Sequence, residues 1–328
     1  MKFDLTKHWY RNDLVSFALW PVSLLLCGLA KLRRKRIEKQ GHLLSQNVPV
    51  IIVGNITVGG TGKTPMVIWL ARFLRQQGFK PGIVSRGYGG NHQRATLVTN
   101  DSNSLEVGDE ALVIARRSGV PLCVGKDRLG AANTLLASKM IDVIISDDGM
   151  QHYRLPRAIE IAMLDGERRF GNGLCLPAGP LREPESRLSE VDFQIVTGTA
   201  SSEHEISMQL KTGRLFNLNS PAKTKALESL RGHQVHAIAG IGNPDRFFNL
   251  LEDFGLIVER HPFPDHYRYE TSDLHFNDGK PVLMTEKDAV KCGLFAESHF
   301  WYLPIEARLP ESLGEQILNR LEEWRNGQ

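Results

Sequence analysis

The 328-residue sequence contains few cysteines and little excess of either charge. Its four cysteines, Cys27, Cys123, Cys175 and Cys292, form no CxxC pair, and no His/Cys cluster surrounds them. This spacing argues against a disulfide framework or a zinc site and favours a reducing compartment. The formal net charge of +3 is too small to predict general affinity for nucleic acid. Repeats and low-complexity blocks are also missing from the sequence.

The N-terminal region has a long apolar stretch followed by a basic one. Residues 14–30 carry no charged side chain. The aromatic residues Trp9, Tyr10 and Trp20 lie before or within this stretch, and six Lys and Arg residues follow within 31–39. A signal peptide would need a small-residue cleavage site, which "KLRRKR" does not offer. A spanning helix would be short and interrupted by Pro21, and a buried core helix is the other alternative. We predict that residues 1–40 form a membrane-associated helix with its cations on anionic headgroups on the cytoplasmic side.

Apolar runs alternate with amphipathic segments from residue 48 onward. Strands are predicted at 48–54, 80–85, 120–125, 141–147 and 159–165, and helices at 65–78, 108–119 and 127–138. This alternation predicts an α/β fold: a mostly parallel sheet with helices on both faces over residues 41–225. Residues 205–218 resemble an antiparallel ribbon, and a smaller second α/β domain is expected over 226–328.

A phosphate-binding loop is predicted between the first strand and the first helix. The stretch reads Val58, Gly59, Gly60, Thr61, Gly62, Lys63, Thr64, Pro65. Glycines let successive backbone N–H groups surround an anion, and the following helix adds its positive dipole end. Lys63 would reach the β- and γ-phosphates, and the Thr64 hydroxyl would ligate Mg²⁺. Thr57 stands where the full pattern has its first glycine, and a glycine-rich turn with a chance lysine is the structural alternative.

A metal-binding carboxylate is expected to accompany this loop. Asp147 and Asp148 end the apolar run at 143–146, at the strand edge where open α/β sheets bind ligands. On a strand the two side chains would point to opposite faces, so either could be the Mg²⁺ ligand. A solvated turn is the alternative for this pair.

Eight motifs occur in the order of a known family over most of the chain. They are "VGNITVGGTGKTP", "SRGYGG", "GDE", "DDGMQH", "PAGPLREP", "GIGNPDRFF", "FPDHY" and "TEKDAV". Together they resemble the tetraacyldisaccharide 4'-kinases of lipid A biosynthesis in Gram-negative bacteria. The resemblance implies transfer of the ATP γ-phosphate to the 4'-hydroxyl of a tetraacylated glucosamine disaccharide 1-phosphate, giving lipid IVA at the cytoplasmic face of the bacterial inner membrane. No protein partner is evident.

A general base for the sugar hydroxyl is also expected. Asp109 in "GDE" is the candidate, although from sequence alone it could equally cap the helix that follows Gly108. The resemblance implies that Asp109 pairs with a histidine of the second domain, here His266, so that domain closure would complete the site. Without the resemblance, His266 is a loop histidine among aromatic residues.

Five further residues are weaker candidates for substrate binding. Arg86 and Tyr88 lie on a glycine-rich loop that could face the disaccharide or merely close a turn. Arg182 suits bidentate phosphate binding, Glu183 could add a metal ligand, and Gln151 could support the metal site.

Two other motifs suggest nucleotide sites but fail on spacing. "GIGNPDRF" lacks the third glycine of a dinucleotide loop, and the lysine of "TEKDAV" directly precedes its aspartate, unlike the guanine-reading pattern. ATP is therefore the expected nucleotide. Two other functions stay open on the residues alone: a membrane-associated P-loop ATPase or switch protein with a protein partner, and a soluble P-loop kinase or ligase of small metabolites.

Overall fold

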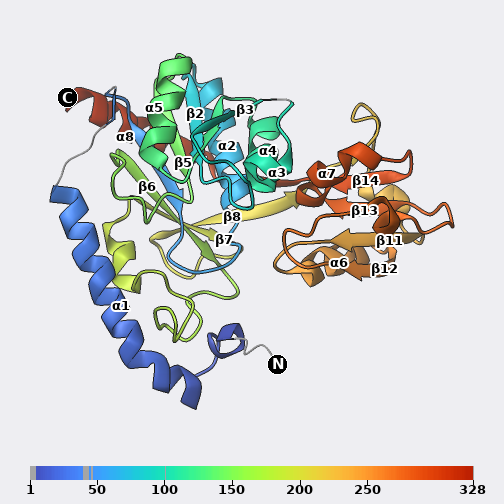
Figure 1. The fold of residues 1–328 in the computed structure, drawn as a ribbon, viewed down its shortest axis with the longest axis horizontal. Helices are drawn as coiled ribbons and strands as arrows, with labels where there is room; N and C mark the ends of the chain where they lie inside the picture. The colour runs from blue at the N-terminus through green and yellow to red at the C-terminus, as the bar shows by residue number, and fades with distance from the viewer. Residues whose placement is uncertain (1–4, 40–43, 46, 100, 328) are drawn as a thin grey trace.

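The computed structural model describes residues 5–39, 44–45, 47–99 and 101–327. Two sheets lie beside each other, and the long N-terminal helix runs along the flank of the larger one (Figure 1). Each sheet has two hydrophobic core clusters of its own.

The larger sheet has nine strands in the order β15-β8-β7-β6-β1-β5-β2-β4-β3. They are β1 (Val50–Gly54), β2 (Pro81–Ser85), β3 (Thr96–Val98), β4 (Leu122–Val124), β5 (Val143–Asp147), β6 (Ile159–Asp165), β7 (Phe193–Thr197), β8 (Glu205–Thr212) and β15 (Ile305–Arg308). Only β3 and β15 run antiparallel to their neighbours. The mostly parallel sheet predicted from the apolar runs is confirmed.

Helices cover both faces of this sheet. Ile51 and Val53 of β1 share one core cluster with residues of α2 (Lys63–Gln76), α4 (Asp109–Ser118) and α8 (Glu311–Asn326), whereas Val50 and Ile52 share another with residues of α5 (Arg128–Ser138). Successive side chains of a strand point to opposite faces, so an uninterrupted apolar strand serves two cores. The short helix α3 (Ser104–Val107) precedes α4.

The smaller sheet has six strands in the order β10-β9-β14-β13-β11-β12. They are β9 (Leu215–Asn217), β10 (Thr224–Lys225), β11 (Gln234–Ala239), β12 (Ile257–Pro262), β13 (Val282–Thr285) and β14 (Phe300–Leu303), with helices α6 (Pro244–Asp253) and α7 (Glu286–Cys292). Short 3₁₀ helices occur at Leu5–His8, Glu185–Glu190, Leu227–Leu230, Thr271–Leu274 and Gly293–Phe295. A second α/β unit is thus present.

Two details of the predicted organisation differ from the structure. The ribbon predicted over 205–218 is wrong, because β8 pairs parallel with β7 while β9 pairs with β14 in the other sheet. Sheet membership also departs from the expected division at residue 225: β9 and β10 belong to the smaller sheet, and β15 with α8 returns to the larger one. Strand periodicity alone carries no information about which sheet a strand joins.

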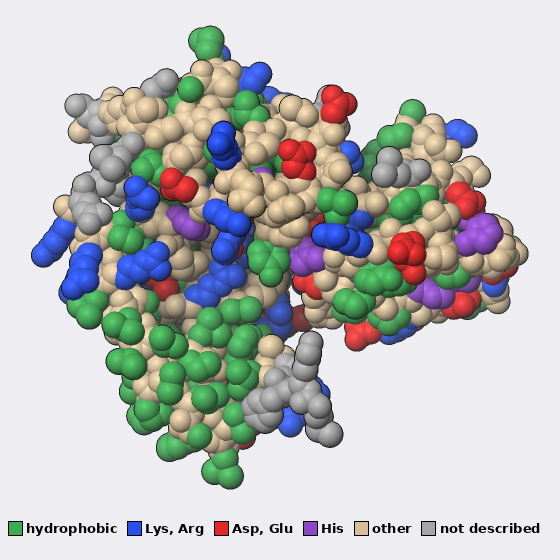
Figure 2. All heavy atoms as spheres, viewed as in Figure 1, with side chains coloured by type: hydrophobic (Ala, Val, Ile, Leu, Met, Phe, Trp, Pro, Cys, Tyr) green, Lys and Arg blue, Asp and Glu red, His purple; other side chains and the backbone are tan. Residues whose placement is uncertain are grey.

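Helix α1 (Leu14–Lys39) passes through Pro21 without a break, and among the described residues it is the helix long and apolar enough to cross a membrane. The side of α1 that bears Ser23 faces the protein. The Ser23 hydroxyl donates to the carbonyl of Cys175 at 2.8 Å and accepts from the N–H of Ala178 at 3.0 Å. Its other side is exposed and apolar, as the green surface in Figure 2 shows. A helix buried in the core would hide that side.

Candidate active site

The predicted phosphate loop forms a turn between β1 and α2. Lys63 is the first residue of α2, and its ammonium donates to Oδ1 of Asn55 at 3.0 Å. The Asn55 amide in turn donates to the carbonyl of Thr57 at 2.7 Å. Asn55 therefore holds both the start of the loop and the lysine at its end.

The phosphate loop requires glycine both for its backbone conformation and because a side chain would clash with neighbouring atoms. Gly59 and Gly62 have φ values of 109° and 81°, which residues other than glycine rarely adopt. A Cβ on Gly62 would also lie 2.6 Å from Oγ1 of Thr197. That hydroxyl donates to the carbonyl of Thr61 at 2.9 Å, so β7 supports the loop from outside.

Arg168 closes the other side of the loop and was missed from the sequence. Its guanidinium donates to the carbonyl of Gly60 and is held by Asp165 at 2.8 Å. Asp165 is the last residue of β6, the strand next to β1. The pattern "LDGERR" after an apolar strand is the only sequence sign of this contact. Beside Asp165, a cavity of about 240 Å³ is lined by Thr197 and by Arg246 of α6, so the smaller unit approaches the ends of β6 and β7.

The two adjacent aspartates occupy different settings. Asp147 ends β5, is buried, and accepts from the Ser85 hydroxyl at 2.8 Å. Burial, with Glu110 and Asp148 adding negative charge, raises the pKa of Asp147 to about 6. Asp148 lies beyond the strand with a φ of 49°, so strand alternation does not govern its direction. Its burial favours a higher pKa, but Lys63 at 3.5 Å and Arg182 at 3.2 Å hold the pKa below its usual value.

Arg182, Gln151 and Glu183 come together beside Asp148. Arg182 donates to both carboxylate oxygens of Asp148 at 3.2 Å and to Oε1 of Gln151 at 3.3 Å. The Gln151 amide donates to Glu183 at 2.8 Å and to the carbonyl of Asn55 at 3.2 Å. These three predicted residues therefore connect to the phosphate loop through Asp148 and Asn55.

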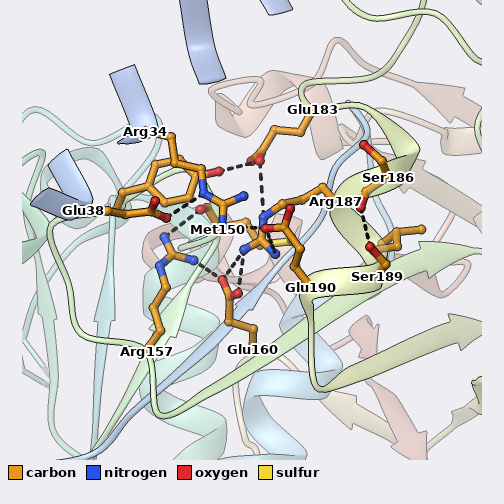
Figure 3. Close-up of polar contacts among 12 residues, drawn as sticks. Arg34, Glu38, Met150, Arg157, Glu160, Glu183, Ser186, Arg187, Ser189 and Glu190 are labelled. Atoms are coloured by element: carbon orange, nitrogen blue, oxygen red, sulfur yellow. Dashed lines mark hydrogen bonds and ion pairs between the residues drawn. The ribbon is translucent and has the colours of Figure 1, made fainter. Parts of the chain in front are cut away.

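Glu183 also belongs to a buried ionic network that reaches helix α1 (Figure 3). Tyr153 donates its hydroxyl to Glu183, and Arg187 lies between Glu183 at 3.5 Å and Glu160 at 2.5 Å. Glu190 continues the network to Arg34 of α1, at 2.6 Å. Since Glu183 is buried and already has these partners, its carboxylate is held away from free solvent.

Asp109 and His266 form the pair that the family resemblance implied. Nδ1 of His266 lies 3.1 Å from Oδ2 of Asp109. Asp109 is the first residue of α4, and its other oxygen accepts from the N–H of Glu110 at 2.9 Å, while Gly108 stands at the cap position. Burial favours a higher pKa for Asp109, but the contact with His266 and the charge of Lys287 lower the pKa below its usual value. The bond to Asp109 raises the pKa of His266.

Packing of α4 against α7 joins the two units behind this pair. Lys287 of α7 donates to Glu110 of α4 at 2.9 Å, and Arg117 of α4 donates to Glu286 at 2.8 Å. Burial alone would lower the pKa of Lys287, but Glu110 and Asp109 raise it. The ammonium is therefore a permanent cation beside Asp109.

The two predicted residues of the loop after β2 lie at the surface. Tyr88 is 61% exposed and its ring leans on that of His266, with centroids 5.1 Å apart. Gly108 packs against this loop, where a Cβ would lie 2.5 Å from the carbonyl of Tyr88. Arg86 is exposed. Tyr88 thus borders the Asp109–His266 pair.

Comparison with known proteins gives one consistent answer. The family described as "Tetraacyldisaccharide-1-P 4'-kinase" matches residues 15–322. The tetraacyldisaccharide 4'-kinase of Methylobacillus flagellatus is 51% identical over 97% of this chain and 95% of its own length. That of Nitrosococcus oceani is 47% identical over 97% and 94%.

A solved structure agrees. LpxK from Aquifex aeolicus, determined in complex with ATP, superposes with a TM-score of 0.80 at 27% identity, covering 94% of this chain and 100% of that one. The chain belongs to the tetraacyldisaccharide-1-P 4'-kinase family.

Proposed function

We propose that this protein transfers the γ-phosphate of ATP to the 4'-hydroxyl of a tetraacylated glucosamine disaccharide 1-phosphate, forming lipid IVA in lipid A biosynthesis. One observation carries the proposal beyond family membership. The phosphate loop, Asp147 and the loop bearing Tyr88 follow the adjacent strands β1, β5 and β2 at one carboxyl edge, with the Asp109–His266 pair beside them. A site for a phosphate donor and an acid–base pair would therefore share one edge of the sheet.

The nucleotide would lie on residues 58–65. Backbone N–H groups of the loop and of the start of α2 would face the phosphates. Lys63, which donates to Asn55, would instead donate to the β- and γ-phosphates when the nucleotide binds. Arg168 and Thr197 keep the loop carbonyls turned outward by binding those of Gly60 and Thr61.

The site suits Mg²⁺, which we assign to Thr64, Asp147 and Asp148. Oxygen donors are the ligands that Mg²⁺ prefers, and a bound cation would stabilise the ionised form of Asp147, whose pKa burial raises to about 6. Bound there, the ion would neutralise charge on the phosphates. Asp148 already faces Lys63 and Arg182, so Asp147 is the better candidate for direct ligation.

Asp109 is the proposed general base. Its lowered pKa keeps it ionised at neutral pH, so it can accept the proton of the 4'-hydroxyl while that oxygen bonds to the γ-phosphorus and the bond to ADP breaks. The transition state of phosphoryl transfer is loose, so a weak but well-placed base is sufficient. His266 would hold Asp109 in position and share the proton afterwards.

The remaining predicted residues are assigned to the acceptor and its surroundings. Arg182, held by Asp148 and Gln151, would meet a phosphate. Gln151 would act through its bonds to Arg182 and to the carbonyl of Asn55, and Glu183 through its bond to Gln151. Tyr88 is exposed beside the Asp109–His266 pair, Arg86 is exposed on the same loop, and both would face the disaccharide.

Helix α1 would dock the enzyme on the cytoplasmic face of the inner membrane. Leu14, Phe17, Leu25 and Leu29 are each more than half exposed, and the basic residues follow at the end of the same helix. Removing a four-chain lipid from the bilayer costs about 0.8 kcal/mol per CH₂, so an enzyme acting at the headgroup gains from binding the surface. We expect Leu25→Ser/Leu29→Ser to reduce flotation with anionic vesicles about tenfold, while the exposed Leu105→Ser control floats normally.

The proposed reaction is tested with γ-labelled ATP, Mg²⁺ and tetraacyldisaccharide 1-phosphate in mild detergent. Label should move to the lipid and be nearly lost in Lys63→Ala. Steady ATP hydrolysis that ignores the lipid and labels none of it would instead favour the ATPase or switch function.

A further inference from the structure

A group of metal-ligating side chains lies in the smaller sheet, outside the proposed active site. His236 is on β11, and Glu259 and His261 are on the adjacent parallel strand β12. His236 is in register with Glu259, and residues two apart on a strand share a face. Strand geometry therefore brings all three side chains to one face of the sheet.

Their donor atoms converge. Nδ1 of His236 lies 3.0 Å from Nε2 of His261 and 3.4 Å from Oε2 of Glu259, and Nε2 of His261 lies 3.8 Å from Oε1 of Glu259. One donor from each residue lies within 4.8 Å of the others. Two nitrogens bound tetrahedrally to zinc are about 3.3 Å apart, so only a small opening is needed.

Asp278 orients the central histidine. Both of its carboxylate oxygens lie near Nε2 of His236, at 3.1 and 3.2 Å, and Lys280 holds the carboxylate at 2.8 Å. The N–H of His236 therefore points to Asp278 and leaves the lone pair of Nδ1 directed at His261 and Glu259. A carboxylate behind a ligating histidine is the arrangement common in zinc sites.

The aromatic ring of Phe276 packs against both histidines of this group. The ring of Phe276 stacks on His236 at 3.9 Å between centroids and contacts His261 at 4.4 Å. His236 is 2% exposed, whereas Glu259 is open to solvent. The buried ligand is thus fixed before binding, and an ion can enter from the side of Glu259.

We propose that His236, Glu259 and His261 bind one Zn²⁺, with water in the fourth position. Two imidazoles and one carboxylate suit zinc, and Mg²⁺, which prefers six oxygen ligands, does not fit. The ion would fasten the edge strand β12 to β11. Since His266 follows His261 by five residues, it would also restrain the segment that brings His266 to Asp109. The cysteine spacing, which argued against zinc, carries no information on these histidines.

The alternative is a hydrogen-bonded pair of imidazoles in which a proton takes the place of the metal. Chelator-treated full-length protein in mild detergent distinguishes the two. We expect one equivalent of Co²⁺ to give the visible absorption of a four-coordinate site, and Zn²⁺ to displace it with micromolar or tighter affinity, unaffected by millimolar Mg²⁺.

Variants at the open side avoid the risk that His236→Gln fails to fold. His261→Gln should lose at least 100-fold in Zn²⁺ affinity, Glu259→Gln about tenfold, and Asp278→Asn about tenfold. His233→Gln, an exposed histidine just before β11, is the matched control and should bind like the wild type. Zn²⁺ should raise the unfolding temperature of the wild type and the control but not of His261→Gln.

Absence of a one-to-one complex in the wild type, or equal affinity in His261→Gln, would overturn the zinc site in favour of the imidazole pair. Neither measurement needs phosphate transfer, so the result is independent of the proposed kinase activity.

Discussion

The phosphate loop and the Asp109–His266 pair are built in different ways. The loop is contiguous in sequence, and its supports Asn55, Arg168 and Thr197 all come from the larger sheet. The pair joins α4 of the larger unit to a loop after β12 of the smaller one and depends on the contact between α4 and α7. One half of the site is formed within a single unit, whereas the other is formed by residues of both units.

This difference predicts that nucleotide binding and phosphate transfer can be separated. Changes in the loop should affect both. Changes in the pair, or in the packing behind it, should affect transfer while ATP still binds.

The largest effect is expected at the loop. Lys63→Ala removes the cation that we propose binds the phosphates, and it should lower kcat about 10³-fold while weakening ATP binding. Steady-state transfer and ATP titration measure the two effects. Lys139→Ala, an exposed lysine at the end of α5, is the control and should leave both unchanged.

A smaller loss confined to kcat is expected at the pair. Asp109→Asn keeps the size of the side chain but cannot accept the proton, so kcat should fall about 10²-fold. The Kd for ATP should stay within about twofold of the wild type. Loss of ATP binding in this variant would show that the two halves of the site are not separate.

The packing between the units should matter less. Lys287→Met removes the ammonium between Glu110 and Asp109 but keeps the length of the side chain. We expect kcat to fall about tenfold, because the pair is held less firmly, with ATP binding unchanged. Glu297→Gln changes a half-exposed carboxylate of the same unit that pairs with His275 and His299, and it should have no effect.

The smallest effect is a shift in titration. The pKa of His266 is raised by Asp109, so it should fall toward its usual value in Asp109→Asn, as histidine NMR would show. His266 contributes fully to the stability of the folded protein when the pH is below the pKa that this histidine has in the unfolded chain. The contribution is lost as the pH rises through the higher pKa that it has in the folded protein. The contribution of Asp109, whose pKa is lowered, is present above its unfolded pKa and lost as pH falls through the folded value. An unchanged His266 titration in Asp109→Asn would contradict the contact.

The sequence predicted the contiguous half of the site better than the assembled half. An apolar strand, glycines and Lys63 lie within 20 residues, and Asp147 ends another apolar run, so local pattern was sufficient to place the loop before α2 and Asp147 at the end of β5. Asp109 and His266 are 157 residues apart, and only the family resemblance connected them. Arg168 and Thr197 were missed because their contacts are made to backbone carbonyls, for which "LDGERR" after an apolar strand is at most a weak sign in the sequence.

The errors in the fold have the same origin. Alternation in 205–218 is equally compatible with a hairpin and with two strands in separate sheets. The return of β15 and α8 to the larger sheet depends on packing of residues such as Gly314, where a Cβ would lie 2.7 Å from the ring of Phe73. Such long-range packing was not visible in local periodicity.

The most direct test is a single turnover of bound, γ-labelled ATP onto tetraacyldisaccharide 1-phosphate in the wild type, Asp109→Asn and Lys63→Ala. We predict that Asp109→Asn binds ATP normally and transfers label to the lipid about 10²-fold more slowly, whereas Lys63→Ala binds ATP weakly and transfers almost none. Transfer at the wild-type rate in Asp109→Asn, or label appearing only as free phosphate in the wild type, would contradict a phosphate-transfer site shared by the two units.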